Sequence, residues 1–223
     1  MTASHPSRDA ARPDPGVAPT ATAGLARPAR AMTIPLVVAT FFVGTLVLGG
    51  ALGLNGTGRV GWHAAVRATA VVAFPLWLLV YTAGPLAQLA PGSVTRALRR
   101  SRRAIGLAVF VAQMIHLAAI LGLTRLEAGT LTEPAALYGG GLAYLMLTLM
   151  AATSNDAAVA RLGARNWRRL HGFGQGVLAI VYVATYGPLM AGDPAYWPAG
   201  LALLAAFGLR ATAFWKRRAS ARA

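Results

Sequence analysis

Residues 101–124 read SRRAIGLAVFVAQMIHLAAILGLT, and this stretch decides the fold. Arg102 and Arg103 are followed by a long apolar run, 104–124, whose one titratable side chain is His116. About twenty apolar residues are needed to cross the hydrocarbon core of a bilayer as a helix. The stretch therefore predicts a transmembrane helix that starts at a membrane surface rich in arginine.

The same arrangement recurs along the whole chain. Eighteen of the 21 Lys and Arg residues lie in four clusters, at 8–30, 96–103, 161–169 and 210–222. Apolar runs of spanning length occupy 33–54, 63–90, 104–124, 135–153, 171–190 and 198–215. Because basic residues concentrate on the cytoplasmic side of membrane proteins, all four clusters are expected there. We predict an all-α polytopic bundle of six transmembrane helices, with the N and C termini cytoplasmic.

Composition supports one membrane domain in the cytoplasmic (inner) membrane. The chain has 223 residues, of which 56% are hydrophobic and 12% charged, which is too apolar for a soluble domain. We predict a disordered basic tail at 1–31, a six-helix domain at 32–216 and a basic tail at 217–223. The net charge of +15 is assigned to orientation and to contact with anionic membrane lipid. Nucleic acid is not expected as a partner, because no recognition motif is visible.

Several kinds of chemistry are excluded or disfavoured. Cysteine is absent, which excludes disulfides, iron–sulfur clusters and thiolate sites. All six acidic residues fall in the N-terminal tail or in loops, which disfavours a proton-coupled transporter. There is no dinucleotide or phosphate loop, so an electron donor would be a membrane quinol or a separate flavin reductase.

Histidines inside or beside the spans are the candidate ligands. His116 lies thirteen residues after Arg103, about 20 Å along a helix, in the outer half of its span. It is either a ligand or a hydrogen-bonded packing residue. His171 follows Arg168 and Arg169 at the cytoplasmic mouth of the fifth span, where its position alone favours a simple interfacial role.

A third candidate opens the second span. His63 lies at the outer boundary, and Arg67 follows one helical turn later on the same face. An imidazole can ligate iron and a guanidinium can hold a heme propionate. The alternative is that both are ordinary end-of-helix residues. Two glycine groups, 139–141 and 172–176, are expected to serve close helix packing rather than to leave room for a flat ligand.

Three segments resemble the ferric-reductase-like transmembrane family. The first is RRAIGL at 102–107, with His116 ten residues after Gly106. The second is TSND at 153–156, which continues to LGARNWRRLH at 162–171. The third, HAAVR at 63–67, is similar to a bacterial branch that contains the heme-binding membrane subunit of the periplasmic methionine sulfoxide reductase system.

The resemblance implies heme b held between helices by imidazoles, with single electrons passed across the membrane. The acceptor would be ferric iron or a periplasmic redox partner. Family members usually carry a second histidine thirteen residues after the Leu-His position, and this chain has Ala184 there. The depths of His171 and His116 differ, so His63 with His116 is the preferred pair for one heme.

The fifth span offers other ligand types in place of the missing histidine. They are Tyr182, Tyr186 and Met190, with Tyr186 nearest the depth of His116. An inner heme on His171 alone would be five-coordinate. Ala184 also motivates an alternative, a non-catalytic scaffold or small-ligand binder of the same fold that has lost full heme ligation. Whether the chain is an enzyme of oxidoreductase type stays open at this point.

Overall fold

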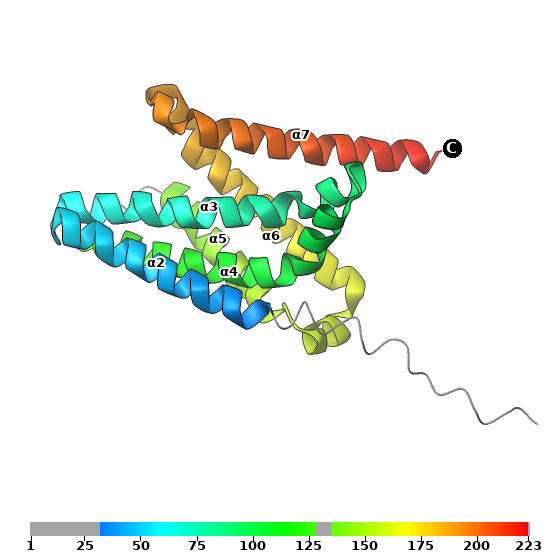
Figure 1. Ribbon diagram of the computed structural model, residues 1–223, viewed down its shortest axis with the longest axis horizontal. Helices are drawn as coiled ribbons and strands as arrows, with labels where there is room; N and C mark the ends of the chain where they lie inside the picture. The colour runs from blue at the N-terminus through cyan, green and yellow to red at the C-terminus, as the bar shows by residue number, and fades with distance from the viewer. Residues whose placement is uncertain (1–31, 128–134, 223) are drawn as a thin grey trace, which may run out of the picture.

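The computed structural model describes residues 32–127 and 135–222, and nearly all of these residues are helical (Figure 1). The predicted tail at 1–31 lies outside the described residues. The elements in chain order are α2 (Thr33–Asn55), α3 (Arg59–Leu89), α4 (Ser93–Thr124), the π-helical turn η1 (Ala135–Gly139), α5 (Gly140–Ala152), α6 (Asp156–Gly192), the 3-10 turn η2 (Pro194–Tyr196) and α7 (Trp197–Ser220).

Five of the helices are long and apolar enough to cross a membrane, namely α2, α3, α4, α6 and the η2–α7 segment. The sixth predicted span, 135–153, is a shorter apolar helix made of η1 and α5. Gly139, Gly140 and Gly141 lie where the π turn passes into α5, and glycine weakens a helix by about 1 kcal/mol per residue. Across residues 32–127 and 135–222, the all-helical membrane fold is confirmed, as five long helices and one shorter apolar helix.

The helices form two groups around a shared interior. α2, α3 and α4 lie side by side, while α6 packs against α5 and α7 (Figure 1). The turn from α2 to α3 is tight: Gly56 has a φ of 77°, and a Cβ on Gly61 would overlap the carbonyl oxygen of Gly56. Only glycine meets both conditions, which explains the glycines of this turn.

Aromatic side chains from α3, α6 and α7 fill the centre. Trp77 is fully buried, and its ring lies 4.4 Å from Tyr182 and 4.6 Å from Tyr81, measured between centroids. Tyr81 in turn contacts Phe207 of α7 at 5.7 Å. Such ring pairs add about 0.5–1.5 kcal/mol each beyond the area they bury. They hold α6 and α7 against α3.

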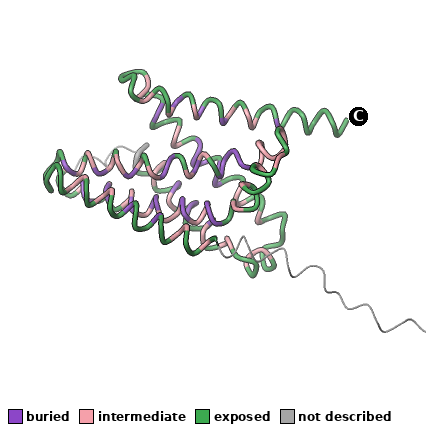
Figure 2. The backbone as a smooth tube through the Cα atoms, viewed as in Figure 1, coloured by how far each residue is buried: buried purple, intermediate pink, exposed green. Residues whose placement is uncertain are grey.

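Burial is confined to the faces where helices meet, and the outer faces are exposed (Figure 2). These outer faces are apolar; Phe42, Leu46, Val71 and Ile180, for example, are each at least 66% exposed. A water-soluble protein rarely exposes apolar surface on this scale. The surface is that of helices facing lipid, and the chain is a multi-pass membrane protein.

Three helices extend well beyond the predicted spans. α4 begins at Ser93, before the expected start at 104. α6 begins at Asp156, well before the expected start at 171, and it is kinked at Gly163, where φ is 76° and ψ is 147°. A side chain is strained in that left-handed region, so glycine permits the kink. α7 continues through the predicted domain limit at 216 to Ser220. Helical structure therefore reaches into the basic C-terminal segment.

Candidate functional site

A cavity of about 600 Å³ lies between α3, α4, α5 and α6. Its walls are mainly apolar, and its polar side chains are Gln113, His116, Tyr144, Tyr182, Thr185 and Tyr186. The volume lies in the range of small-molecule and cofactor sites, which are apolar clefts with a few placed polar groups.

His116 lines this cavity, and a threonine orients its ring. The Nδ1 atom of His116 lies 2.9 Å from the hydroxyl of Thr69 on α3. That hydroxyl donates its single hydrogen to the carbonyl oxygen of Ala65, 2.7 Å away. It therefore accepts from the Nδ1–H of His116, which leaves the lone pair on Nε2. A second group that fixes the tautomer in this way is usual for histidine ligands.

The α6 side of the cavity supplies tyrosines. The amide nitrogen of Gln113 donates to the hydroxyl of Tyr182 over 2.7 Å. Gln113 precedes His116 by three residues, which places both on one face of α4. Tyr186 is 8% exposed and also lines the cavity, as does Ala184. The tyrosine proposed from sequence therefore shares a cavity with His116.

Glycine residues on the cavity wall leave part of its volume unfilled. Gly139 and Gly140 line it, and a Cβ added to either would meet no atom within 4 Å. The same holds for Gly141, Gly172 and Gly176. The expectation that these glycines serve close helix packing was wrong, because no neighbouring helix approaches them. The pair Gly139 and Gly140 leaves open space at the cavity wall.

His63 lies near the N-terminal end of α3 and does not line the cavity. Its Nε2 atom is 3.0 Å from the carboxylate of Glu127, which also accepts a hydrogen bond from Arg59. Hydrogen bonds from His63 and Arg59 lower the pKa of the Glu127 carboxyl. Thr69, the contact of His116, follows His63 by six residues, about 9 Å along the helix. The structure thus does not bring His63 and His116 together, and Arg67 is exposed.

His171 also lies away from the cavity, at the end of the bundle where α5 passes into α6. Its Nε2 atom is 3.1 Å from the Thr153 hydroxyl, and its ring stacks on Trp167 with 4.1 Å between centroids. The Trp167 indole donates to the carbonyl oxygen of Thr153 over 2.9 Å. Both ring contacts hold His171 against the α5–α6 loop.

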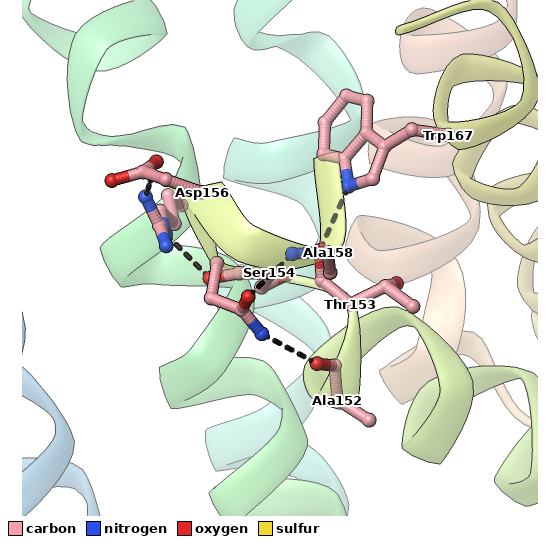
Figure 3. A network of polar contacts seen from close by, with 8 residues as sticks. Ala152, Thr153, Ser154, Asp156, Ala158 and Trp167 are labelled. Atoms are coloured by element: carbon pink, nitrogen blue, oxygen red, sulfur yellow. Dashed lines mark hydrogen bonds and ion pairs between the residues drawn. The ribbon is translucent and has the colours of Figure 1, made fainter. Parts of the chain in front are cut away.

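That loop is the TSND segment, and it links three helices (Figure 3). Asn155 caps α6 by accepting from the Ala158 amide over 2.7 Å. Arg103 of α4 donates to the Ser154 carbonyl oxygen and, over 2.9 Å, to the Asp156 carboxylate. The TSND residues, which carry the most specific sequence resemblance, therefore form a structural junction. This junction positions the N-terminal part of α6 and His171.

Gln113, which lines the cavity, and Thr69, which contacts His116, were not identified from sequence. Thr69 and Gln113 are buried polar side chains within apolar spans, and such groups are normally hydrogen-bonded. Gln113 could have been found from its i, i+3 spacing to His116. Thr69 could not, because its contact depends on how α3 and α4 face each other.

No protein-only metal site is visible: across residues 32–127 and 135–222, no three His, Cys, Asp or Glu side chains gather. The cavity wall offers one imidazole, from His116, and several tyrosine phenols. Such a set of ligands suits a metal ion that is already bound in a macrocycle. On the α4 side of the cavity, His116 is the described residue that would hold such a group. On the α6 side, tyrosines are the available groups.

Comparison with known proteins gives one match. Residues 68–185 match the family described as ferric reductase like transmembrane component. The matched region covers just over half of the chain and includes His116, His171 and Ala184, while His63 and Arg67 lie before it. No curated protein and no solved structure matches the chain.

Proposed function

Because the chain belongs to the ferric reductase-like transmembrane family, we propose that it is a heme b protein that passes single electrons across the membrane. The donor is a quinol or a separate cytoplasmic flavin reductase, and the acceptor is ferric iron or a periplasmic redox partner. One observation carries the proposal. A single cavity is lined both by His116, whose ring is held by Thr69, and by Gly139 and Gly140, beside which the space is open.

His116 is the proposed axial ligand, through Nε2. Thr69 holds its ring by accepting from Nδ1–H, and it ties that contact to the α3 backbone at Ala65. Heme, when bound, supplies reversible one-electron chemistry. The apolar walls exclude water, which lowers the local dielectric around the site.

Tyr186 and Tyr182 are the proposed partners on the far side. Both line the cavity from α6, and Gln113 positions the Tyr182 hydroxyl. Phenolate is a known ligand type for heme iron. We rank these tyrosines above His63, whose Nε2 contacts Glu127. A second heme on His171 is not part of the proposal, because its Nε2 contacts Thr153.

The test is a dithionite-reduced minus oxidised absorption spectrum of detergent-purified protein, with heme quantified per chain. We expect a b-type difference spectrum and about one heme per chain. Protein that stays colourless after expression in heme-replete cells would contradict the proposal. Two hemes per chain would contradict the single-site assignment and would mean that His171 binds iron.

A second function rests on Ala184. This residue lines the cavity and supplies no ligand atom, so the chain could be a non-catalytic scaffold or small-ligand binder of the same fold. The variant Ala184→His separates the two. If the cavity binds heme, a histidine here shifts the spectrum towards a six-coordinate, bis-histidine form. If the fold no longer takes heme, the variant purifies as colourless as the parent protein.

A further inference from the structure

A second hollow lies at the turn between α3 and α4. Its volume is about 460 Å³, and it is lined by Ala87, Pro91, Arg96, Arg99 and Arg100. The turn comprises the three residues after Leu89 and before Ser93. The hollow is therefore at the end of the bundle where the apolar part of α4 gives way to its arginines.

Three other basic side chains at this end have partners. Arg103 pairs with Asp156, and Arg217 donates to the Gln88 side chain over 2.6 Å. Arg210 donates to the Tyr81 carbonyl oxygen over 3.3 Å, and its guanidinium lies 4.2 Å from the centre of the Tyr81 ring. These contacts hold α4 to α6 and α7 to α3.

The three arginines of the hollow differ from these. Within the described parts of the chain, Arg96, Arg99 and Arg100 have no carboxylate partner and donate no side-chain hydrogen bond. All three are exposed. Three guanidinium groups around one hollow repel each other unless an anion lies between them, and guanidinium groups match phosphate oxygens with two parallel hydrogen bonds.

The position indicates which anion this is. The exposed apolar side chain of Val94 lies two residues before Arg96, and the wall of the hollow itself includes Ala87 and Pro91. A free phosphate ion would gain no binding energy from contact with the apolar residues of this wall. Basic pockets between helices at a membrane surface are typical sites for anionic lipid headgroups. We propose that Arg96, Arg99 and Arg100 bind the phosphate of an anionic phospholipid whose glycerol region contacts Ala87 and Pro91.

The proposal is independent of heme binding. It also differs from general attraction of a basic protein to an acidic membrane, because it requires the hollow. The cluster on α6 provides the matched comparison. Arg161, Arg165 and Arg168 are equally exposed, but they do not line either hollow.

The experiment measures retention of phosphatidylglycerol against phosphatidylcholine by native mass spectrometry of the full chain. The test variant is R96Q/R99Q/R100Q and the control is R161Q/R165Q/R168Q, so both lose three charges. We expect phosphatidylglycerol affinity to fall at least about tenfold in the test variant and less than about twofold in the control. An equal fall in both variants would overturn the proposal.

Two further measurements, on a single-site variant and with inorganic phosphate, complete the experiment. Arg99→Gln alone is expected to give a partial loss, and it supplies the answer if the triple variant does not fold. Inorganic phosphate is titrated in detergent without lipid. If phosphate binds with the same arginine dependence and phosphatidylglycerol binds no more tightly, the hollow is a free-phosphate site and the lipid proposal is wrong.

Discussion

His116 and His171 are held by the same kind of contact and differ in what remains available. In each case a threonine hydroxyl lies within hydrogen-bonding distance of the ring, and it donates to a carbonyl oxygen four residues earlier, Ala65 for Thr69 and Leu149 for Thr153. At His116 the threonine hydroxyl contacts Nδ1, so Nε2 remains available to a ligand. At His171 the threonine hydroxyl contacts Nε2, so the remaining nitrogen is Nδ1, which is next to the residue's own Cβ.

This difference decides which histidine can receive a flat, bulky ligand. Nε2 is at the tip of the imidazole ring and projects away from the helix, whereas Nδ1 is crowded by the backbone. His116 also lines a cavity, while the ring of His171 stacks on Trp167. Residue type and a threonine partner are therefore not enough to identify a ligand. The bonded nitrogen and the adjacent space decide it.

The largest expected effect separates the two histidines directly. His116→Ala should remove nearly all bound heme, because His116 is the only imidazole on the cavity wall among the residues that the structure describes. His171→Ala should keep heme content close to that of the parent protein. Heme per chain is measured by the pyridine hemochromogen assay on protein of matched helix content. Loss of heme in His171→Ala with retention in His116→Ala would reverse the comparison.

Filling the cavity should come next in size. Gly140→Leu adds a side chain at the cavity wall, and the Cβ of this side chain would meet no atom within 4 Å. We expect heme content to fall by more than half. Gly208→Leu on α7 is the matched control, because a Cβ there is equally unhindered and the residue does not line the cavity. Equal heme loss in both variants would argue against the cavity as the site.

The threonines provide a finer test. Thr69→Val removes the group that orients His116, and loss of such a contact typically weakens metal affinity 10- to 100-fold. Thr153→Val should leave heme affinity unchanged and lower stability by about 1 kcal/mol, the usual value of one hydrogen bond. Heme transfer to an apo-globin acceptor measures the first effect, and thermal unfolding measures the second. Equal heme affinity in the two variants would remove the distinction between the histidines.

The smallest effect concerns His63, whose partner is a carboxylate instead of a hydroxyl. The pKa of Glu127 is lowered in the folded state, chiefly by its hydrogen bond to His63. Its stabilising contribution is thus present above the unfolded pKa of about 4.3 and is lost as the pH falls through the lower folded value. Glu127→Gln should lower Tm by at most about 2–4 °C at pH 7.

That difference should shrink below about pH 4, because the wild-type carboxyl is then protonated as well. Unfolding scans of both proteins from pH 7 to pH 3 check this. A gap in Tm that stays constant with pH would mean that the charge of Glu127 does not stabilise its contacts with the N-terminal end of α3.

The sequence predicted the helices better than it predicted their contacts. Charge clusters and apolar run lengths located all six apolar segments, because the bilayer imposes the length of a span. The kink at Gly163 was not predicted, since a positive φ leaves no trace beyond the glycine itself. The short α5 was not predicted either, because an apolar run does not distinguish a full helix from one that begins in a π turn.

The site was predicted in part for the same reason. His116 stood out as a titratable group inside a span, and Tyr186 stood out by depth; the structure places both on one cavity. The predicted pairing of His63 with His116 assumed that the short connection between their helices places the two residues at the same depth in the membrane. Instead Glu127, 64 residues after His63, contacts it. Axial offsets of this kind depend on how helices slide past each other, which spacing along one helix does not report.

The short α5 has a consequence for the surrounding lipid. The apolar helix that η1 and α5 form, Leu137–Ala152, extends about 24 Å, against a hydrocarbon thickness of about 30 Å. A helix shorter than the hydrocarbon is accommodated by thinning of the bilayer, by snorkelling of flanking residues or by oligomerisation, at a free-energy cost that grows with the mismatch. Gly139 and Gly140, at the N-terminal end of α5, line the cavity. Lipid that adapts to the short helix therefore adjoins the cavity wall, and we expect acyl-chain length to act on this site.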